Sequence, residues 1–153
     1  IIAEGIERGR IETLRGYSSI RKEVSYGDEK SRIDLLLTSA HLKDCYVEIK
    51  SVTLLEQPVS HGIGFFPDAI SERGSRHLRE LARVATSGQR AVLCFCVQHS
   101  GIQEVRPATR IDPDYANALA IAIKAGVEVI ACKVRLSTRS STVGRLLPVI
   151  IEP

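Results

Sequence analysis

Asp34, Glu48 and Lys50 are the residues of this chain whose types and spacing best suit a chemical role. Glu48 and Lys50 are two residues apart in CYVEIKS, so in a strand their side chains point to one face of the sheet. Asp34 interrupts the apolar run RIDLLL, and it comes beside Glu48 if the two segments pair as a hairpin. Two neighbouring carboxylates repel each other, and a divalent cation bound between them relieves that repulsion.

Mg²⁺ is bound in proteins through one or two carboxylates, waters and substrate phosphates, which matches such an acidic pair. A lysine beside the ion can orient or deprotonate a bound water, or neutralise charge that develops on a phosphoryl group. The sequence therefore predicts metal-assisted phosphodiester hydrolysis, with Asp34 and Glu48 as ligands of Mg²⁺ or Mn²⁺ and Lys50 beside the water. The alternative interpretation is an ordinary cross-strand cluster of ion pairs at a solvated face.

Three predicted strands position these side chains. Residues 20–26 alternate in polarity and end at the turn signal Gly-Asp-Glu-Lys, and residues 31–37 and 45–50 form the next two strands. The short connections between them favour an antiparallel meander. Such a meander places Asp34 on the strand next to the one that carries Glu48.

The other elements complete a mixed sheet. Ser71 and Asp112 are predicted N-caps, the second followed by Pro113 at the first helical position. Pro148 makes the tail 143–151 an edge strand or coil. We therefore expect an α/β fold whose mixed β-sheet has helices on both faces. The expected elements are helices over residues 2–14, 72–85 and 113–125 and strands over 20–26, 31–37, 45–50, 91–97 and 127–136.

A second group of candidate residues lies at the start of the predicted helix 72–85. Arg73 and His77 are i, i+4 neighbours near its N-terminus, and both helix N-termini and guanidinium groups favour phosphate. We predict that Arg73, Arg76 and His77 contact a nucleic-acid backbone, with the irregular segment 53–70 as a guide. The alternative is a solvated basic face. The basic side of the helix consists of Arg73, Arg76, Arg79 and Arg83.

Composition limits the class of protein. The chain has 153 residues, 44% hydrophobic and 25% charged, which predicts one globular domain over residues 1–153 rather than a disordered chain. A net charge of +3 is compatible with an anionic partner. No apolar run is long enough to span a membrane and no signal peptide is visible, so we expect a cytoplasmic protein. The four cysteines have no zinc-ligand spacing and are expected to be buried reduced thiols.

Five segments together resemble the sugar fermentation stimulation protein A (SfsA) family, over residues 17–137. They are RKEVSYGDEKSRIDLLL, CYVEIKSVTL, FFPDAISERGSRHLREL, AVLCFCVQ and AGVEVIACKVRLS. The resemblance implies a restriction-endonuclease-like mixed sheet, a bacterial DNA-binding protein and a role in regulating sugar (maltose) metabolism. It also implies an N-terminal OB-fold-like domain, which this chain is expected to lack; the missing initial Met agrees with that expectation.

The same resemblance assigns roles to residues. The PD-(D/E)xK motif falls on Asp34, Glu48 and Lys50, although Ile33 stands where the motif has proline. The first two would bind the metal and Lys50 would assist the water. Nucleases of this type often add a glutamate from the first helix, for which Glu4 is the candidate; the alternative for Glu4 is a solvated helix residue.

Three functions remain open from the sequence. The first is a DNA-binding protein with a nuclease-type site, possessing Mg²⁺-dependent phosphodiesterase activity. The second is a non-catalytic DNA-binding regulator of sugar metabolism that retains the nuclease fold. The third is a structural or metal-binding interaction protein without a nucleic-acid partner. Neither a P-loop nor a GxGxxG motif is present, so NTPase and dinucleotide-binding functions lack support.

Overall fold

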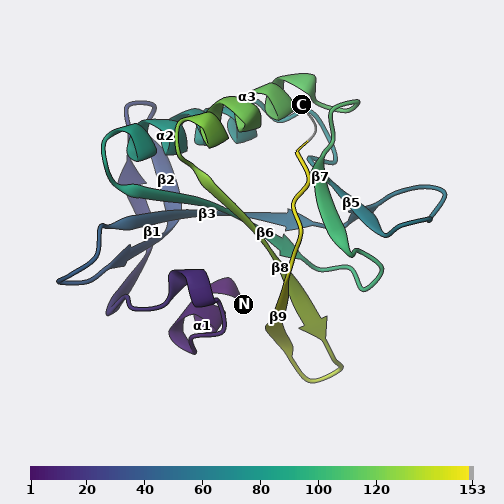
Figure 1. The fold of residues 1–153 in the computed structure, drawn as a ribbon, viewed down its shortest axis with the longest axis horizontal. Helices are drawn as coiled ribbons and strands as arrows, with labels where there is room; N and C mark the ends of the chain where they lie inside the picture. Colours follow the sequence, from purple (N-terminus) through teal and green to yellow (C-terminus); the bar gives the residue numbers. More distant parts are fainter. Residues whose placement is uncertain (152–153) are drawn as a thin grey trace.

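The computed structural model describes residues 1–151 and is built around a six-stranded mixed sheet in the order β1-β2-β3-β6-β8-β9 (Figure 1). The first three strands form the antiparallel meander that the sequence predicts, and β3, β6 and β8 run parallel. The helices are α1 Ile2–Glu7, η1 Glu12–Leu14, α2 Glu72–Thr86 and α3 Pro113–Lys124. The strands are β1 Ser19–Tyr26, β2 Ser31–Thr38, β3 Cys45–Val52, β4 Leu54–Leu55, β5 Ile63–Phe66, β6 Arg90–Val97, β7 Glu104–Pro107, β8 Glu128–Leu136 and β9 Ser141–Leu147.

Helices cover both faces of this sheet, as expected. Side chains of α2 and α3 form one core with Leu93, Phe95 and Ala131 on the first face. Side chains of α1 and η1 form a second core with Val47 and Cys94 on the other face. Strand β6 is buried along almost its whole length because its alternate residues enter both cores, which explains its continuous apolar sequence.

The single N-terminal helix predicted over residues 2–14 is wrong in length, because the structure has a shorter helix followed by a separate turn. The helix α1 ends at Glu7, and the single turn η1 follows after Gly9, whose φ of +65° is left-handed. A left-handed residue ends an α-helix, and glycine adopts that conformation without steric cost. The break lets Ile11 and Leu14 both enter the second core, although their spacing does not continue the stripe of α1.

The segment 53–70 is more regular than its sequence suggests. It contains β4 and β5, which join β7 in a separate three-stranded sheet. Glu56 begins the loop between β4 and β5, and its carboxylate accepts hydrogen bonds from the backbone N–H groups of Ser60 and Gly62. Both Gln57–Pro58 and Phe66–Pro67 are cis peptide bonds.

The C-terminal tail resolves the alternative left open by Pro148. Residues up to Leu147 form β9, which pairs antiparallel with β8 at the edge of the large sheet. Pro148 lies just beyond the strand, where its missing N–H removes no ladder hydrogen bond. The four cysteines are buried and free, as expected. Within residues 1–151, no helix combines the length and apolar character needed to cross a bilayer.

Candidate functional site

Asp34 and Glu48 lie on adjacent strands where the β2–β3 ladder ends. The register pairs Leu35 with Val47, so Asp34 comes level with Glu48 just beyond the paired residues. Beyond the last paired residues, the N–H of Ile49 donates to a side chain instead of to the backbone of β2. It forms a hydrogen bond of 2.7 Å with Asp34 Oδ2. One acid is thereby fixed against the backbone of the strand that carries the other.

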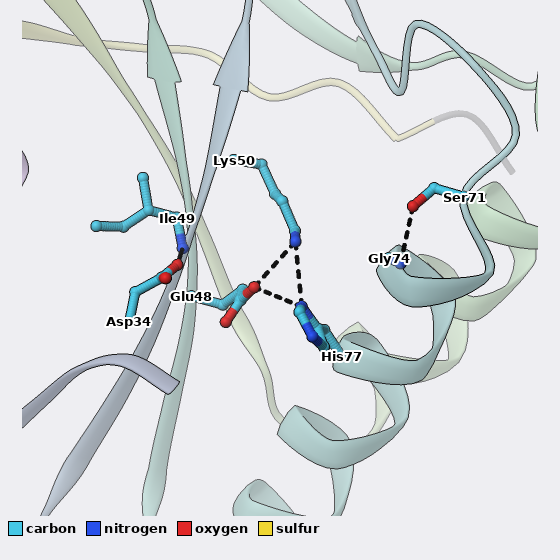
Figure 2. A network of polar contacts seen from close by, with 7 residues as sticks. All are labelled: Asp34, Glu48, Ile49, Lys50, Ser71, Gly74 and His77. Atoms are coloured by element: carbon cyan, nitrogen blue, oxygen red, sulfur yellow. Dashed lines mark hydrogen bonds and ion pairs between the residues drawn. The ribbon is translucent and has the colours of Figure 1, made fainter. Parts of the chain in front are cut away.

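Glu48 is the centre of a polar network on the face of β3 that looks toward α2 (Figure 2). It is only 2% exposed. Its Oε1 lies 2.9 Å from Lys50 Nζ and 2.5 Å from His77 Nδ1, and those two nitrogens are 3.1 Å apart. Lys50 and His77 thus converge on a single oxygen of one buried carboxylate.

The two acids have opposite electrostatic surroundings. Burial raises the pKa of Asp34, the N–H of Ile49 opposes this, and the nearby charge of Glu48 raises it further. Burial also acts to raise the pKa of Glu48, but His77 and Lys50 hold that pKa below its ordinary value. A pair of acids whose pKa values are driven apart in this way is typical of sites that bind ions or move protons.

The second oxygen of Glu48 provides a test of whether a metal fits. Glu48 Oε2 is buried and has no hydrogen-bond partner. The hydroxyls of Tyr26 and Tyr115 are also buried without a hydrogen-bond partner. The charge of Glu48 contributes to raising the pKa of both phenols, after burial as the main cause. A buried carboxylate oxygen without a partner is costly unless a ligand satisfies it, so the donor set of Asp34 and Glu48 fits a hard cation.

The described part of the chain does not supply a larger ligand set. No group of three or more His, Cys, Asp or Glu side chains that could hold a metal is found within residues 1–151. A cation at this site would therefore keep much of its shell for water or substrate oxygens, which is the usual arrangement for Mg²⁺.

Glu4 does not join the site. It lies on α1, whose side chains enter the core on the sheet face opposite to the one that α2 covers. Its carboxylate pairs instead with Arg8 at 3.0 Å, one helical turn away, and both side chains are exposed. The expectation that Glu4 faces Asp34 and Glu48 is wrong because Ile2 and Ile6 turn toward the core and Glu4 does not.

The predicted phosphate contacts on α2 divide into different environments. Arg73 is exposed in the first turn, and Arg76 is half-buried with its Nε lacking a partner. His77 is only 3% exposed and contacts Glu48, so its predicted role at the surface is corrected to one inside the network. Arg79 and Arg83 both pair with Glu29 at 3.0 Å, which removes them as free contacts.

His77 is a neighbour of Glu48 that sequence reasoning placed at the surface instead. Gly74, His77, Leu78 and Leu81 are all buried and follow the spacing of one helical stripe. That spacing identifies His77 as a core-facing residue. Its partner Glu48 is 29 residues away in the chain, and only the packing of α2 on β3 brings the two together.

The fold and the site define a mixed α/β protein with a buried cluster of acid, lysine and histidine beside a second acid. The family model described as "Sugar fermentation stimulation protein RE domain" matches residues 1–140, and the chain belongs to this SfsA family. A sugar fermentation stimulation protein homolog of Pseudoalteromonas atlantica is 51% identical over 151 residues, 99% of this chain and 63% of that protein. A homolog from Shewanella sp. strain MR-4 is 50% identical over 149 residues, 97% of this chain and 62% of that protein.

A solved structure gives the same architecture. Pyrococcus furiosus SfsA in complex with Ca²⁺ superposes with a TM-score of 0.87 at 30% identity, and the match covers 98% of this chain. The chain spans 62% of that protein and a similar share of the two homologs, so the function of the full-length relatives extends beyond what these residues establish. The fold class expected from the sequence is confirmed.

Proposed function

We propose that this chain carries a divalent-metal site of the PD-(D/E)xK type and hydrolyses phosphodiester bonds in DNA. The observation that carries the proposal is the unpartnered, buried Glu48 Oε2 next to Asp34, with the ammonium group of Lys50 on the same carboxylate. The Ca²⁺ named for the Pyrococcus furiosus SfsA supports a divalent ion in this family. Mg²⁺ or Mn²⁺ is the proposed ion for activity.

Each residue has a distinct part in this proposal. Asp34 and Glu48 would hold the ion, which when bound lowers the pKa of a water and polarises a phosphoryl oxygen. Lys50 supplies a positive charge that can orient the attacking water or stabilise charge that develops on the phosphoryl group. His77 contacts Glu48 Oε1, and the unpartnered Oε2 would then be available to the ion.

DNA cleavage by the 153-residue chain tests the proposal. Plasmid, linear and single-stranded DNA are incubated with Mg²⁺, Mn²⁺ or EDTA, and the products are separated on gels. We expect cleavage that needs the metal and falls at least about 100-fold in Asp34→Asn, Glu48→Gln and Lys50→Met. The matched controls Glu4→Gln and Lys43→Met, an exposed acid and an exposed lysine, are expected to keep the activity. Absence of cleavage, or equal loss in the controls, contradicts the proposal.

A non-catalytic DNA-binding regulator of sugar metabolism is the second candidate. The observation that favours it is that Lys50 and His77 already satisfy Glu48 Oε1, as they would in a purely structural cluster. Metal-independent DNA binding without cleavage, unchanged in Glu48→Gln, would support it. Four buried free thiols suit a reducing compartment, and we propose a cytoplasmic location for either function.

A further inference from the structure

The positive charge of this chain is concentrated in one hairpin. Residues 129–151 contain four basic residues and no Asp or Glu, which leaves 17 basic and 18 acidic residues elsewhere in a chain of net charge +3. From Glu128 to Leu147, β8, β9 and the turn between them hold these four basic residues and one acid, Glu128, so this hairpin carries +3 and the charges of the remaining residues cancel. Figure 1 shows the turn between β8 and β9 projecting beyond the sheet, at the end away from α2 and α3. The four residues are Lys133, Arg135, Arg139 and Arg145.

None of these cations is neutralised by an acid in the described residues. Every ion pair within residues 1–151 lies outside them. Arg145 donates to the side-chain oxygen of Gln103 at 2.5 Å, and Lys133 donates to the carbonyl oxygens of Ser100 and Ile102. Burial lowers the pKa of Lys133 and the charge of Arg145 lowers it further, so the two cations repel each other in the free protein.

The register of the sheet places the basic side chains on the face that carries the Glu48 network. Lys50 is level with Phe95, and Phe95 with Ala131, across the parallel strands β3, β6 and β8. Phe95 and Ala131 belong to the core beneath α2 and α3, whereas Cys132 and Val134 belong to the opposite core. Because side chains alternate along a strand, Lys133 and Arg135 share the face of Phe95 and Ala131.

An irregularity in the β8–β9 pairing brings Arg145 to the same face. Val143 enters the core beneath α1, but Leu147 enters the core beneath α2 and α3. The pairing register shifts between Cys132 and Val134. This shift changes which β9 side chains lie on the sheet face that α2 and α3 cover. Arg145, two residues before Leu147, therefore turns toward the face of Lys133, which agrees with its effect on that lysine.

The hairpin suits phosphates rather than a lipid surface. Its tip, LSTRSST, has serine and threonine on both sides of Arg139 in the sequence, and hydroxyls donate to phosphate oxygens; the hydroxyls of Ser137 and Ser140 contact each other within the turn. A membrane-surface element needs apolar and basic side chains to enter the interface together. Leu136 and Leu146 are exposed, but each is adjacent in its strand to a basic residue and so points to the opposite face.

We propose that the basic face of the β8–β9 hairpin binds the backbone of DNA and leads it to the site of Asp34, Glu48 and Lys50. This inference rests on the proposed function for the direction of the DNA, but the binding itself does not need a catalytic site. Lys50 is level with Ala131, two strand spacings away across β6, and Arg135 lies four residues further along β8. Lys50 and Arg135 are therefore about 16 Å apart. A duplex rises about 3.4 Å per base pair, so roughly five base pairs join the two places.

A binding measurement without metal tests the hairpin separately from catalysis. Fluorescence anisotropy follows a labelled 20-base-pair duplex with the 153-residue chain in EDTA, over a series of salt concentrations. The double variant Arg135→Gln/Arg139→Gln removes two exposed cations without a described partner. The matched control Arg21→Gln/Arg32→Gln removes two exposed cations from β1 and β2.

We expect the hairpin variant to weaken binding about tenfold and to reduce the slope of log K against log salt by about 2, because each lost phosphate contact contributes about 0.9. The control is expected to change neither. Equal effects in both variants, or no binding of DNA by the wild type at low salt, overturn the proposal. Binding to phosphatidylserine vesicles with the same arginine dependence and no binding to DNA also overturns it. Hairpin-dependent binding without any cleavage supports the hairpin while contradicting the proposed hydrolysis.

Discussion

His77 is one of the two side chains that contact Glu48 Oε1; the other is Lys50. Replacing His77 with leucine keeps a side chain of similar size but leaves the carboxylate with Lys50 alone. A buried acceptor that loses a partner costs about 1–3 kcal/mol, so we expect the free energy of unfolding of His77→Leu to fall by about 2 kcal/mol. Urea unfolding measures this. His41→Leu, at an exposed loop position, is the control and should stay within about 0.5 kcal/mol of the wild type; an equally small effect of His77→Leu would show that the contact is not structural.

The pair of acids and the lysine were predictable from sequence because each depends on a short-range rule. Alternation places Glu48 and Lys50 on one face, and a charged residue inside the apolar run of β2 singles out Asp34 as a candidate. The contact between His77 and Glu48 depends instead on where α2 packs along β3, and no local spacing in the sequence determines that position. The unpartnered Glu48 Oε2 is likewise a property of the packed site and has no signal in the sequence.

The loop between β4 and β5 depends on the carboxylate of Glu56, which is half-buried. Hydrogen bonds from the backbone N–H groups of Ser60, His61 and Gly62 lower the pKa of Glu56 to about 2. A depressed pKa means that this stabilisation is present above the ordinary value of 4.5 and is lost as the pH falls through about 2. We expect an NMR titration of the Glu56 carboxyl carbon to have its midpoint near 2. In Glu56→Gln the Gly62 amide should exchange faster at neutral pH, and a midpoint near 4.5 would contradict the structure.

The turn between β1 and β2 is held by Glu80 of α2. This carboxylate is fully buried and accepts hydrogen bonds from the N–H groups of Asp28 and Glu29. Gly27 has a φ of +73°, and a Cβ there would lie 1.9 Å from Glu80 Oε2. We expect Gly27→Ala to lower the free energy of unfolding by more than about 2 kcal/mol, because the methyl group must displace a buried carboxyl group from its hydrogen-bond partners.

Gly88→Ala is the matched control for that substitution. Gly88 also has a left-handed φ, +94°, but no atom lies within 4 Å of an added Cβ. Its cost is therefore limited to backbone strain of about 1 kcal/mol. Thermal or urea unfolding of the two variants separates strain from displacement of Glu80, and equal losses would contradict the contact.

Whole elements were predicted well where one periodicity runs through many residues. The helix expected over 72–85 is observed as Glu72–Thr86, and the strand expected over 91–97 as Arg90–Val97. The short strands of the second sheet were missed because β4, β5 and β7 are two to four residues long and lie among prolines and glycines. Their pairing is decided by contacts between distant segments, such as the parallel alignment of Ile63 with Glu104.

At the scale of the molecule, ion binding at two acids should stabilise the entire fold. A ligand that binds only the native state adds about 2.7 kcal/mol at a hundredfold excess over Kd, and 1 kcal/mol shifts Tm by about 2–4 °C in a chain of this size. We therefore expect saturating Ca²⁺ or Mn²⁺ to raise Tm by about 5–10 °C relative to EDTA. The shift should vanish in both Asp34→Asn and Glu48→Gln and persist in Glu4→Gln, whose acid lies on the other face of the sheet. A Tm shift that survives in both site variants would place the ion elsewhere. Because Tm reports ion binding and not DNA cleavage, this measurement distinguishes a missing metal site from a site that binds the ion without cleaving DNA.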